Sequence, residues 1–495
     1  MGSNSDNNNR GGWSRDLRGW LTKLEKENEL KTVNVKVACG GEIQEIGRQM
    51  SERKGPSVLF TNIEGHEDGW CTKLFVGSLN TVSKLALAVG LKSDAVMGDV
   101  VHRLRDTMRH PVDPIRVESG PIKQNVIVGN DIDIRAIPVP MWHPGDQGRY
   151  INLWAGIITR DPDTGEYNVG AYRGVIHDGR RIGVLLFRTQ GWGQHYDKYV
   201  VRGEAMPVAC VYGWDPTLML TAGSPVTLID EWQWMGAIRG EPVPLIPCET
   251  VDLEVPATAE LVIEGTVSPD PATFCQEGPL KEVSGRYCNE SMMPVIEVSG
   301  IMHRHDPIMV GSAIGIAPVL EEQVLTMAAG TTAVLRNALQ DQGVPGVLDL
   351  TLSPFFAVKI RKTYQGQAYQ VACTLFGHKA LNMRYKLLVV VEEDVDLSNP
   401  RAVLNAIYSN ADPKRDMYVF PTQRNLVDTA VSIADSDALG FGGTLGNKML
   451  IDATVNWIAH PRQAKWGGNR RAPTEPPPRE DVETVKKRWR EYGFD

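Results

Sequence analysis

Two glutamates flank a Gly-Pro pair in the segment Glu277-Gly278-Pro279-Leu280-Lys281-Glu282. Residues on one helix face lie three or four apart, so this spacing of five does not place both carboxylates on one face. Gly278 and Pro279 also disfavour a helix. We therefore predict a tight loop that turns both acids toward one point. An arginine from a distant strand would keep one acid ionised and leave the other free to transfer a proton. Taken alone, the pattern also fits a surface loop with two solvated glutamates.

Arg173 is the candidate arginine, at the end of Asn168-Val169-Gly170-Ala171-Tyr172-Arg173. We predict one strand over 167–176, on which Asn168 and Arg173 would point to opposite faces. Both would serve one site only if a ligand lies at the strand edge or a bulge redirects one of them. The alternative for Arg173 is a solvated or ion-paired surface residue, which is usual for arginine.

Other polar residues are candidate ligands with less support. Glu231 precedes a Met-Gly-Ala stretch and is either a metal ligand or an acid at a helix start. His195 is a second candidate ligand, although a lone histidine is more often packed or on the surface. His303 and His305 alternate on a predicted strand, but no carboxylate is placed to complete a zinc site.

The composition excludes several classes of protein. The chain has 495 residues and a formal net charge of −8, which disfavours a nucleic-acid partner. Seven cysteines without a C-x-x-C pair argue against a disulfide framework and for a reducing cytoplasm. No apolar run has transmembrane length and no signal peptide is recognised, so no membrane association is expected. No phosphate-binding loop, dinucleotide fingerprint or nucleophile elbow is present, and Gly440–Gly446 is read as a glycine-rich loop.

The elements that position these residues divide the chain into five parts. We predict a disordered tail at 1–13, an α/β domain at 14–112, an antiparallel sheet or partly open barrel at 113–318, a second α/β unit at 319–466, and a Pro-rich linker with a C-terminal helix at 467–495. The N-terminal helix, at 14–30, has Ser14 as its expected N-cap and keeps Leu17, Trp20, Leu21 and Leu24 on one face.

Later elements are predicted from strand and helix patterns. Runs at 151–159, 167–176 and 182–187, separated by turn signals, predict an antiparallel meander. A continuous apolar run at 386–391 predicts a buried strand. Helices are expected at 321–337 and 400–409.

Taken together, these motifs resemble the UbiD family of reversible decarboxylases, which use prenylated FMN. The resemblance runs from about Asp16 to Trp466, and its ordered matches are more specific than any single motif. Besides the two segments above, it rests on Asp16-Leu-Arg-Gly-Trp-Leu21, Pro56-Ser-Val-Leu-Phe60, Gly236-Ala-Ile-Arg-Gly-Glu-Pro-Val243, Val255–Gly265 and Lys386 before the Val-Val-Val run.

The resemblance implies a mixed α+β fold, with a central split-β-barrel-like flavin-binding domain flanked by α/β regions. It also implies roles for individual residues. The catalytic set falls on Arg173, Glu277 and Glu282, with Glu282 as proton donor. Asn168 and Glu231 match ligands of a divalent metal, typically Mn²⁺, with K⁺ nearby. The family's metal-binding histidine falls on Gly191, and His195 is the candidate replacement. The remaining cofactor contacts are expected from Ala171, Tyr172, Gln190 and Lys386.

The function implied is reversible, non-oxidative decarboxylation of an aromatic, heteroaromatic or α,β-unsaturated carboxylic acid. Loss of CO2 from an sp² carbon needs an electron sink that no side chain provides, so a cofactor must supply it. The expected partners are the acid, CO2 and a flavin prenyltransferase that supplies the cofactor, in a homodimer or homohexamer. Two alternatives remain open: a flavin-dependent redox enzyme, and a non-catalytic subunit of a multi-subunit carboxylase.

Overall fold

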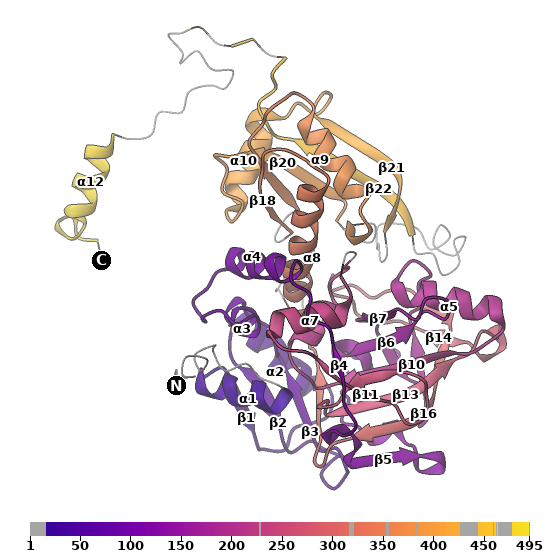
Figure 1. The fold of residues 1–495 in the computed structure, drawn as a ribbon. Helices are drawn as coiled ribbons and strands as arrows, with labels where there is room; N and C mark the ends of the chain where they lie inside the picture. The colour runs from indigo at the N-terminus through magenta and orange to yellow at the C-terminus, as the bar shows by residue number, and fades with distance from the viewer. Residues whose placement is uncertain are drawn as a thin grey trace, which may run out of the picture.

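The computed structural model describes residues 16–226, 229–315, 321–352, 356–381, 385–425, 444–458, 460, 461, 463 and 478–494. Figure 1 shows an N-terminal part in indigo beside a central sheet in magenta, with a C-terminal part in orange above both. Helix α8 (Glu322–Asp341) leads from the central sheet into the C-terminal part, and α12 (Arg479–Lys487) lies apart from the body. The fold is mixed α+β, as predicted.

The N-terminal part is a small sheet covered by helices. Its strand order is β1-β2-β3-β17, so a strand from much later in the chain completes it. The elements are α1 (Leu17–Lys26), β1 (Leu30–Val33), α2 (Gly41–Glu52), β2 (Ser57–Phe60), β3 (Lys73–Val76), α3 (Val82–Ala88), α4 (Met97–Thr107) and β17 (Ile308–Gly311).

Helix α1 buries the predicted apolar face of Leu17, Trp20, Leu21 and Leu24. Its N-cap is Asp16, whose Oδ1 accepts a hydrogen bond from the Gly19 amide at 2.9 Å, whereas Ser14 lies outside the described residues. The prediction that the helix reaches residue 30 is wrong. Asn28 adopts a left-handed conformation with φ 58°, which ends the helical turn, and β1 begins two residues later.

The central sheet curls into a half-barrel of antiparallel strands. Its order is β7-β6-β10-β13-β16-β9-β8, with β5 also paired to β16. The strands are β5 (Asn125–Val128), β6 (Gly156–Arg160), β7 (Tyr167–Gly170), β8 (Gly174–Ile176), β9 (Arg181–Val184), β10 (Met206–Tyr212), β13 (Leu261–Val267) and β16 (Val295–His303).

The predicted single strand at 167–176 is wrong, because the chain breaks into β7 and β8 at opposite ends of the strand order. Residues 171–173 therefore cross the open side of the half-barrel. Two glycines permit the crossing. A Cβ on Gly170 would lie 2.3 Å from the ring of Tyr172, and a Cβ on Gly174 would lie 2.6 Å from Nδ2 of Asn152. The β6–β7 and β8–β9 hairpins of the meander are present, but β6 starts only at Gly156, after a 3₁₀ turn.

Helices and short strands surround the half-barrel, and a five-stranded sheet forms the C-terminal part. The former are β4 (Ile115–Arg116), α5 (Gly191–Arg202), α6 (Thr217–Ala222), α7 (Glu231–Arg239), β11 (Pro244–Pro247), β12 (Glu254–Pro256), β14 (Cys275–Glu277) and β15 (Ser291–Met293). The C-terminal order is β18-β19-β20-β22-β21. Its elements are β18 (Val347–Thr351), β19 (Ala357–Ile360), α9 (Gln367–Phe376), β20 (Leu387–Glu392), α10 (Pro400–Asn410), β21 (Met417–Asn425) and β22 (Thr444–Asp452).

The predicted strand at 386–391 and the helices at 321–337 and 400–409 correspond to β20, α8 and α10. In the glycine-rich segment at 440–446, residues 440–443 lie outside the described part of the chain, and 444–446 begin β22. In the part that the structure describes, no helix is both long and apolar enough to cross a membrane.

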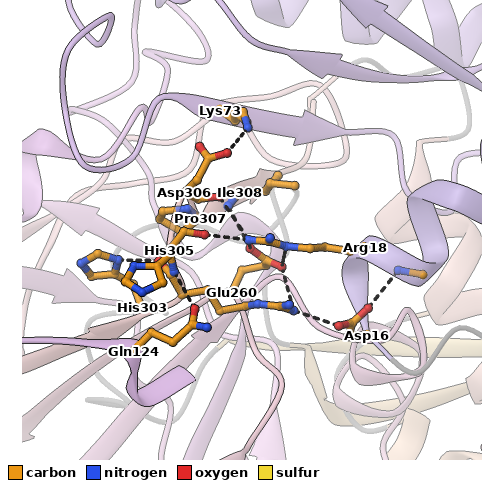
Figure 2. A network of polar contacts seen from close by, with 12 residues as sticks. Asp16, Arg18, Lys73, Gln124, Glu260, His303, His305, Asp306, Pro307 and Ile308 are labelled. Carbon is orange, nitrogen blue, oxygen red and sulfur yellow. Dashed lines mark hydrogen bonds and ion pairs between the residues drawn. The ribbon is translucent and has the colours of Figure 1, made fainter. Parts of the chain in front are cut away.

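A buried carboxylate joins the N-terminal helix to the central part of the molecule (Figure 2). Glu260 is fully buried and accepts hydrogen bonds from Nε and Nη2 of Arg18 at 2.9 and 3.0 Å. Its Oε1 lies 3.2 Å from Nη1 of Arg304, which also pairs with Asp16 at 2.8 Å. The amide of Ile308 donates to Glu260 at 3.2 Å, so this cluster fixes α1 against the start of β17.

The histidines considered as a zinc pair have other contacts in this region. Nδ1 of His303 lies 2.8 Å from the carbonyl oxygen of Arg304, and its ring stacks on Trp70 at 4.5 Å. His305 follows the end of β16 and lies 3.2 Å from Nδ2 of Asn125. The two do not alternate on one strand. Among the described residues, no group of three or more His, Cys, Asp or Glu is arranged to hold a metal.

Candidate active site

The structure brings Arg173, Glu277 and Glu282 into direct contact. Nε and Nη2 of Arg173 donate to the two oxygens of Glu277 at 2.8 and 2.6 Å. Nη1 of Arg173 forms an ion pair with Oε1 of Glu282. Because Arg173 lies in the crossing between β7 and β8, its side chain is not bound by the alternation of a regular strand. The guanidinium therefore holds both carboxylates of the predicted loop.

The loop that carries the two acids is fixed by its backbone. Glu277 ends β14, and Gly278 follows with φ +91°, a conformation that favours glycine. The Gln147 amide donates to the carbonyl oxygen of Pro279 at 2.8 Å, and the Lys281 amide donates to Asp146 at 3.0 Å. These contacts explain why two acids five residues apart point at one arginine.

The two carboxylates have different surroundings. Glu277 is fully buried, and its Oε1 also accepts a hydrogen bond from the hydroxyl of Tyr150 at 3.0 Å. The side chain of Glu282 is 14% exposed and lines a cavity. Burial opposes the charge of Arg173, yet Glu277 and Glu282 together raise its pKa well above its ordinary value. Arg173 therefore remains a cation between the two acids.

A sulfur atom completes the cluster. Sγ of Cys288 lies 3.1 Å from Nη2 of Arg173 and accepts a hydrogen bond from the Leu280 amide at 3.3 Å. Burial raises the pKa of the Cys288 thiol, with Arg173 opposing the shift, so the thiol stays neutral near pH 7. A neutral sulfur is a weak acceptor. It accepts one N–H of the Arg173 guanidinium without competing with the carboxylates.

Two adjoining cavities lie beside the crossing segment. The first contains Arg173 and Glu282 among mainly apolar walls that include Trp154, Phe187 and Leu280. The cavities share the lining residues Ala171, Tyr172, Gln190, Gly223 and Met327.

The second cavity has the groups that an anion and a cation need. It contains Lys379, and Gln190 and Gly191 at the N-terminus of α5, where free amides favour a phosphate. It also contains Asn168 and Glu231, two oxygen donors of the kind that Mg²⁺ and Mn²⁺ take together with phosphate and water. Burial, followed by the charge of Asp230, raises the pKa of Glu231 to about 8. A bound cation would offset the cost of burying the ionised carboxylate of Glu231. These residues therefore fit a flavin phosphate with a divalent metal.

Gly191 is packed against Asn168. A Cβ on Gly191 would lie 1.8 Å from Oδ1 of Asn168, closer than real Cβ atoms approach other atoms. The Asn168 amide contacts the hydroxyl of Tyr172 at 3.3 and 3.4 Å. The Tyr172 ring in turn stacks on Trp192 at 4.3 Å, and Nε1 of Trp192 donates to Gln190 at 3.2 Å. Asn168, Tyr172 and Gln190, three of the residues expected to contact the cofactor, thus lie together with Gly191 in the second cavity.

His195 and Lys386 are not among the residues that line either cavity. His195 lies one turn beyond Gly191 on α5, with its Nδ1 2.9 Å from the hydroxyl of Thr159. Lys386 precedes β20, and its carbonyl oxygen accepts a hydrogen bond from Met449. The cavity lysine is Lys379, which the sequence reading missed. No sequence signal marks it, because its position depends on the turn that follows α9.

Comparisons with known proteins cover most of the chain. Three family models match in succession: the 3-octaprenyl-4-hydroxybenzoate carboxy-lyase N-terminal domain at 21–104, the Rift-related domain at 114–317 and the C-terminal domain at 324–453. An uncharacterized protein of Synechocystis is 29% identical, over 97% of this chain and 96% of its own length.

Two solved structures show the likeness in three dimensions. The vanillic acid decarboxylase of Sedimentibacter hydroxybenzoicus, in closed form, has a TM-score of 0.85 and 25% identity, over 98% of this chain and 100% of that chain. An evolved dimeric form of the UbiD-class enzyme HmfF from Pelotomaculum thermopropionicum, in complex with prFMN, has a TM-score of 0.76 and 27% identity, over 96% of this chain and 100% of that chain.

Proposed function

The chain belongs to the UbiD family, and from this premise we propose that it is a prenylated-FMN-dependent carboxy-lyase. The substrate is an aromatic, heteroaromatic or α,β-unsaturated carboxylic acid. The observation that carries the proposal is the contact of Arg173 with both Glu277 and Glu282 at the wall of a largely apolar cavity. The vanillic acid decarboxylase and the prFMN complex of HmfF support the reaction and the cofactor.

The chemistry divides between cofactor and protein. The prenylated flavin supplies the electron sink when it is bound. The apolar wall around Trp154, Phe187 and Leu280 excludes water from the carboxylate of the substrate, which favours departure as neutral CO2. Glu282, at the edge of the same cavity, takes up a proton from solvent and delivers it to the carbon that has lost CO2. Glu277 remains the anionic partner of Arg173 throughout.

The second cavity holds the anionic end of the cofactor in this proposal. Lys379 and the N-terminal amides of α5 neutralise the phosphate. Asn168 and Glu231 would hold a divalent cation, Mn²⁺, which would offset the charge of the phosphate, and K⁺ would bind nearby. Ala171, Tyr172 and Gln190, which line both cavities, would contact the ring system. His195 and Lys386 are assigned no contact with the cofactor, since neither lines the first or the second cavity.

The remaining parts of the proposal concern direction and assembly. The reaction runs in reverse, as carboxylation, at high CO2. A flavin prenyltransferase supplies the cofactor, and the protein assembles as a homodimer or homohexamer through its 319–466 unit.

The proposal is tested on protein co-expressed with a flavin prenyltransferase, with protein made without that enzyme as control. The absorbance spectrum and the mass of the released cofactor are recorded with and without Mn²⁺. CO2 release is then measured over a panel of hydroxybenzoic, furoic and cinnamic acids. Bound prenylated FMN and CO2 release from one class of acid are expected. Oxidation of NAD(P)H without CO2 release would instead identify a redox enzyme, and activity only with added partner chains a non-catalytic subunit.

A further inference from the structure

Tyr150 has no part in the mechanism above, yet it touches the catalytic cluster directly. Its side chain is fully buried, and its hydroxyl donates to Oε1 of Glu277 at 3.0 Å. The same oxygen accepts Nε of Arg173 at 2.8 Å, and Oε2 accepts Nη2 at 2.6 Å. Three donors therefore bind a carboxylate that is 0% exposed. Among the residues that the structure describes, the side chain of Glu282 pairs with a single donor, Nη1 of Arg173.

The backbone ties Tyr150 to the strand that follows Arg173. Tyr150 forms an antiparallel bridge with Val175, and the Ile151 amide donates to the carbonyl oxygen of Gly174 at 2.8 Å. The Trp142 indole donates to the Tyr150 carbonyl oxygen at 3.0 Å. The phenol and the guanidinium are thus held in one register, and both reach Glu277 from fixed positions.

Tyr150 does not itself act on a substrate. It lines neither of the two cavities. Burial, and then the charge of Glu277, raises its pKa far above the ordinary value, so the hydroxyl stays protonated and always donates. Its closest contact in the cluster is Glu277 at 3.0 Å, and its hydroxyl also lies 3.5 Å from the carbonyl oxygen of Pro279 in the same loop.

We propose that Tyr150 is a positioning residue that locks Glu277 as the permanent anionic partner of Arg173, so that proton exchange is confined to Glu282. The inference rests on the proposed decarboxylase function. Without the phenol, Oε1 of Glu277 loses a donor in a site closed to water. The carboxylate then turns toward the remaining donors of Arg173, and the ion pair that orients Glu282 is weakened.

The test compares Tyr150→Phe, which removes only the hydroxyl, with Tyr196→Phe as a matched control. Tyr196 is 1% exposed and donates to the backbone oxygen of Ser268 at 2.9 Å, away from the cluster. In Tyr150→Phe we expect kcat to fall about tenfold with KM and flavin content unchanged, since one hydrogen bond to a charged group is lost. The control is expected to keep the wild-type kcat.

A second measurement does not depend on turnover. Urea midpoints of the cofactor-free wild type, Tyr150→Phe, Glu277→Gln and the double variant form a double-mutant cycle. Non-additive midpoints are expected, because Tyr150→Phe removes the hydrogen bond and Glu277→Gln removes the charge that strengthens it. Additive midpoints would overturn the inference whatever the activity. The inference would also be overturned if the wild type is active and Tyr150→Phe has the same kcat. A Tyr150→Phe protein in which KM and flavin content change together with kcat would overturn it as well. If the wild type releases no CO2 but the midpoints of the cycle are non-additive, the proposed function is refuted, while the role of Tyr150 in positioning Glu277 still stands.

Discussion

Oδ1 of Asn168 occupies the space in which any side chain at position 191 would begin, because a Cβ on Gly191 would lie 1.8 Å from it. The two residues come from β7 and from the first turn of α5, and they meet in the second cavity. The position of the Asn168 side chain therefore requires a glycine at 191.

Replacing Gly191 with alanine should displace Asn168 and weaken binding at the phosphate end of the cofactor. We expect the affinity of the cofactor-free protein for FMN with Mn²⁺ to fall about tenfold, measured by flavin fluorescence titration. Gly41→Ala is the control, since Gly41 also begins a 12-residue helix but has nothing within 4 Å of its Cβ position. Equal affinities in the two variants would contradict the prediction.

Replacing Glu282 with glutamine should remove turnover but keep the cofactor. A glutamine of the same shape cannot donate the proton, so kcat should fall by about 10²-fold or more. The absorbance of bound flavin should match that of wild type. Glu297→Gln, at an exposed position on β16, should leave both unchanged. A Glu282→Gln protein with full activity would exclude this residue as the acid.

Replacing Glu277 with glutamine should lower stability more than the same change at Glu282. Glu277 is fully buried, and its loss leaves Arg173 with only the ion pair to the more exposed Glu282, which costs roughly 3 kcal/mol. The side chain of Glu282 is 14% exposed, so water compensates part of the change there. Urea unfolding of the two cofactor-free variants measures the difference. Equal free energies of unfolding would refute the assigned asymmetry.

Glu322 should make the docking of α8 depend on pH. Burial raises the pKa of this carboxyl from 4.5 to about 7, while the amides of Leu79 and Gly77 favour its charged form. The folded state therefore binds more protons than the unfolded chain between these values. The stabilisation that protonated Glu322 gives to the folded state is complete below about pH 4.5 and is lost as the pH rises through 7. Relative to wild type, Glu322→Gln should gain stability between pH 5 and 8 in a series of urea midpoints. A difference that does not change with pH would contradict this.

Lys379 and Lys386 offer a direct comparison of two lysines. Lys379 lines the second cavity and Lys386 does not, although the sequence had pointed to Lys386. Lys379→Ala should weaken FMN binding about tenfold, because one charged contact to phosphate is lost. Lys386→Ala should bind FMN as wild type does. The reverse order of affinities would restore the original assignment.

Local sequence patterns predicted much of the fold. The apolar face of α1 and the continuous run of β20 were predicted correctly, because burial of one face imposes a period that a sequence displays. The sequence also predicted the chemistry of the Glu277–Glu282 loop. Gly and Pro disfavour a helix there, and two carboxylates brought to one place need a cation as partner.

Other features depended on contacts between distant segments. The break between β7 and β8 puts neighbouring residues at opposite edges of one sheet, and no period in 167–176 encodes this. The hydroxyl of Tyr150 reaches a carboxylate 127 residues away, and Lys379 enters the cavity only through the turn after α9. The sequence determined which residues had the chemistry, because residue type and local period are properties of short segments. Only the tertiary structure decided which of them meet, because closing the half-barrel brings its two edges, α5 and the Glu277–Glu282 loop to one place.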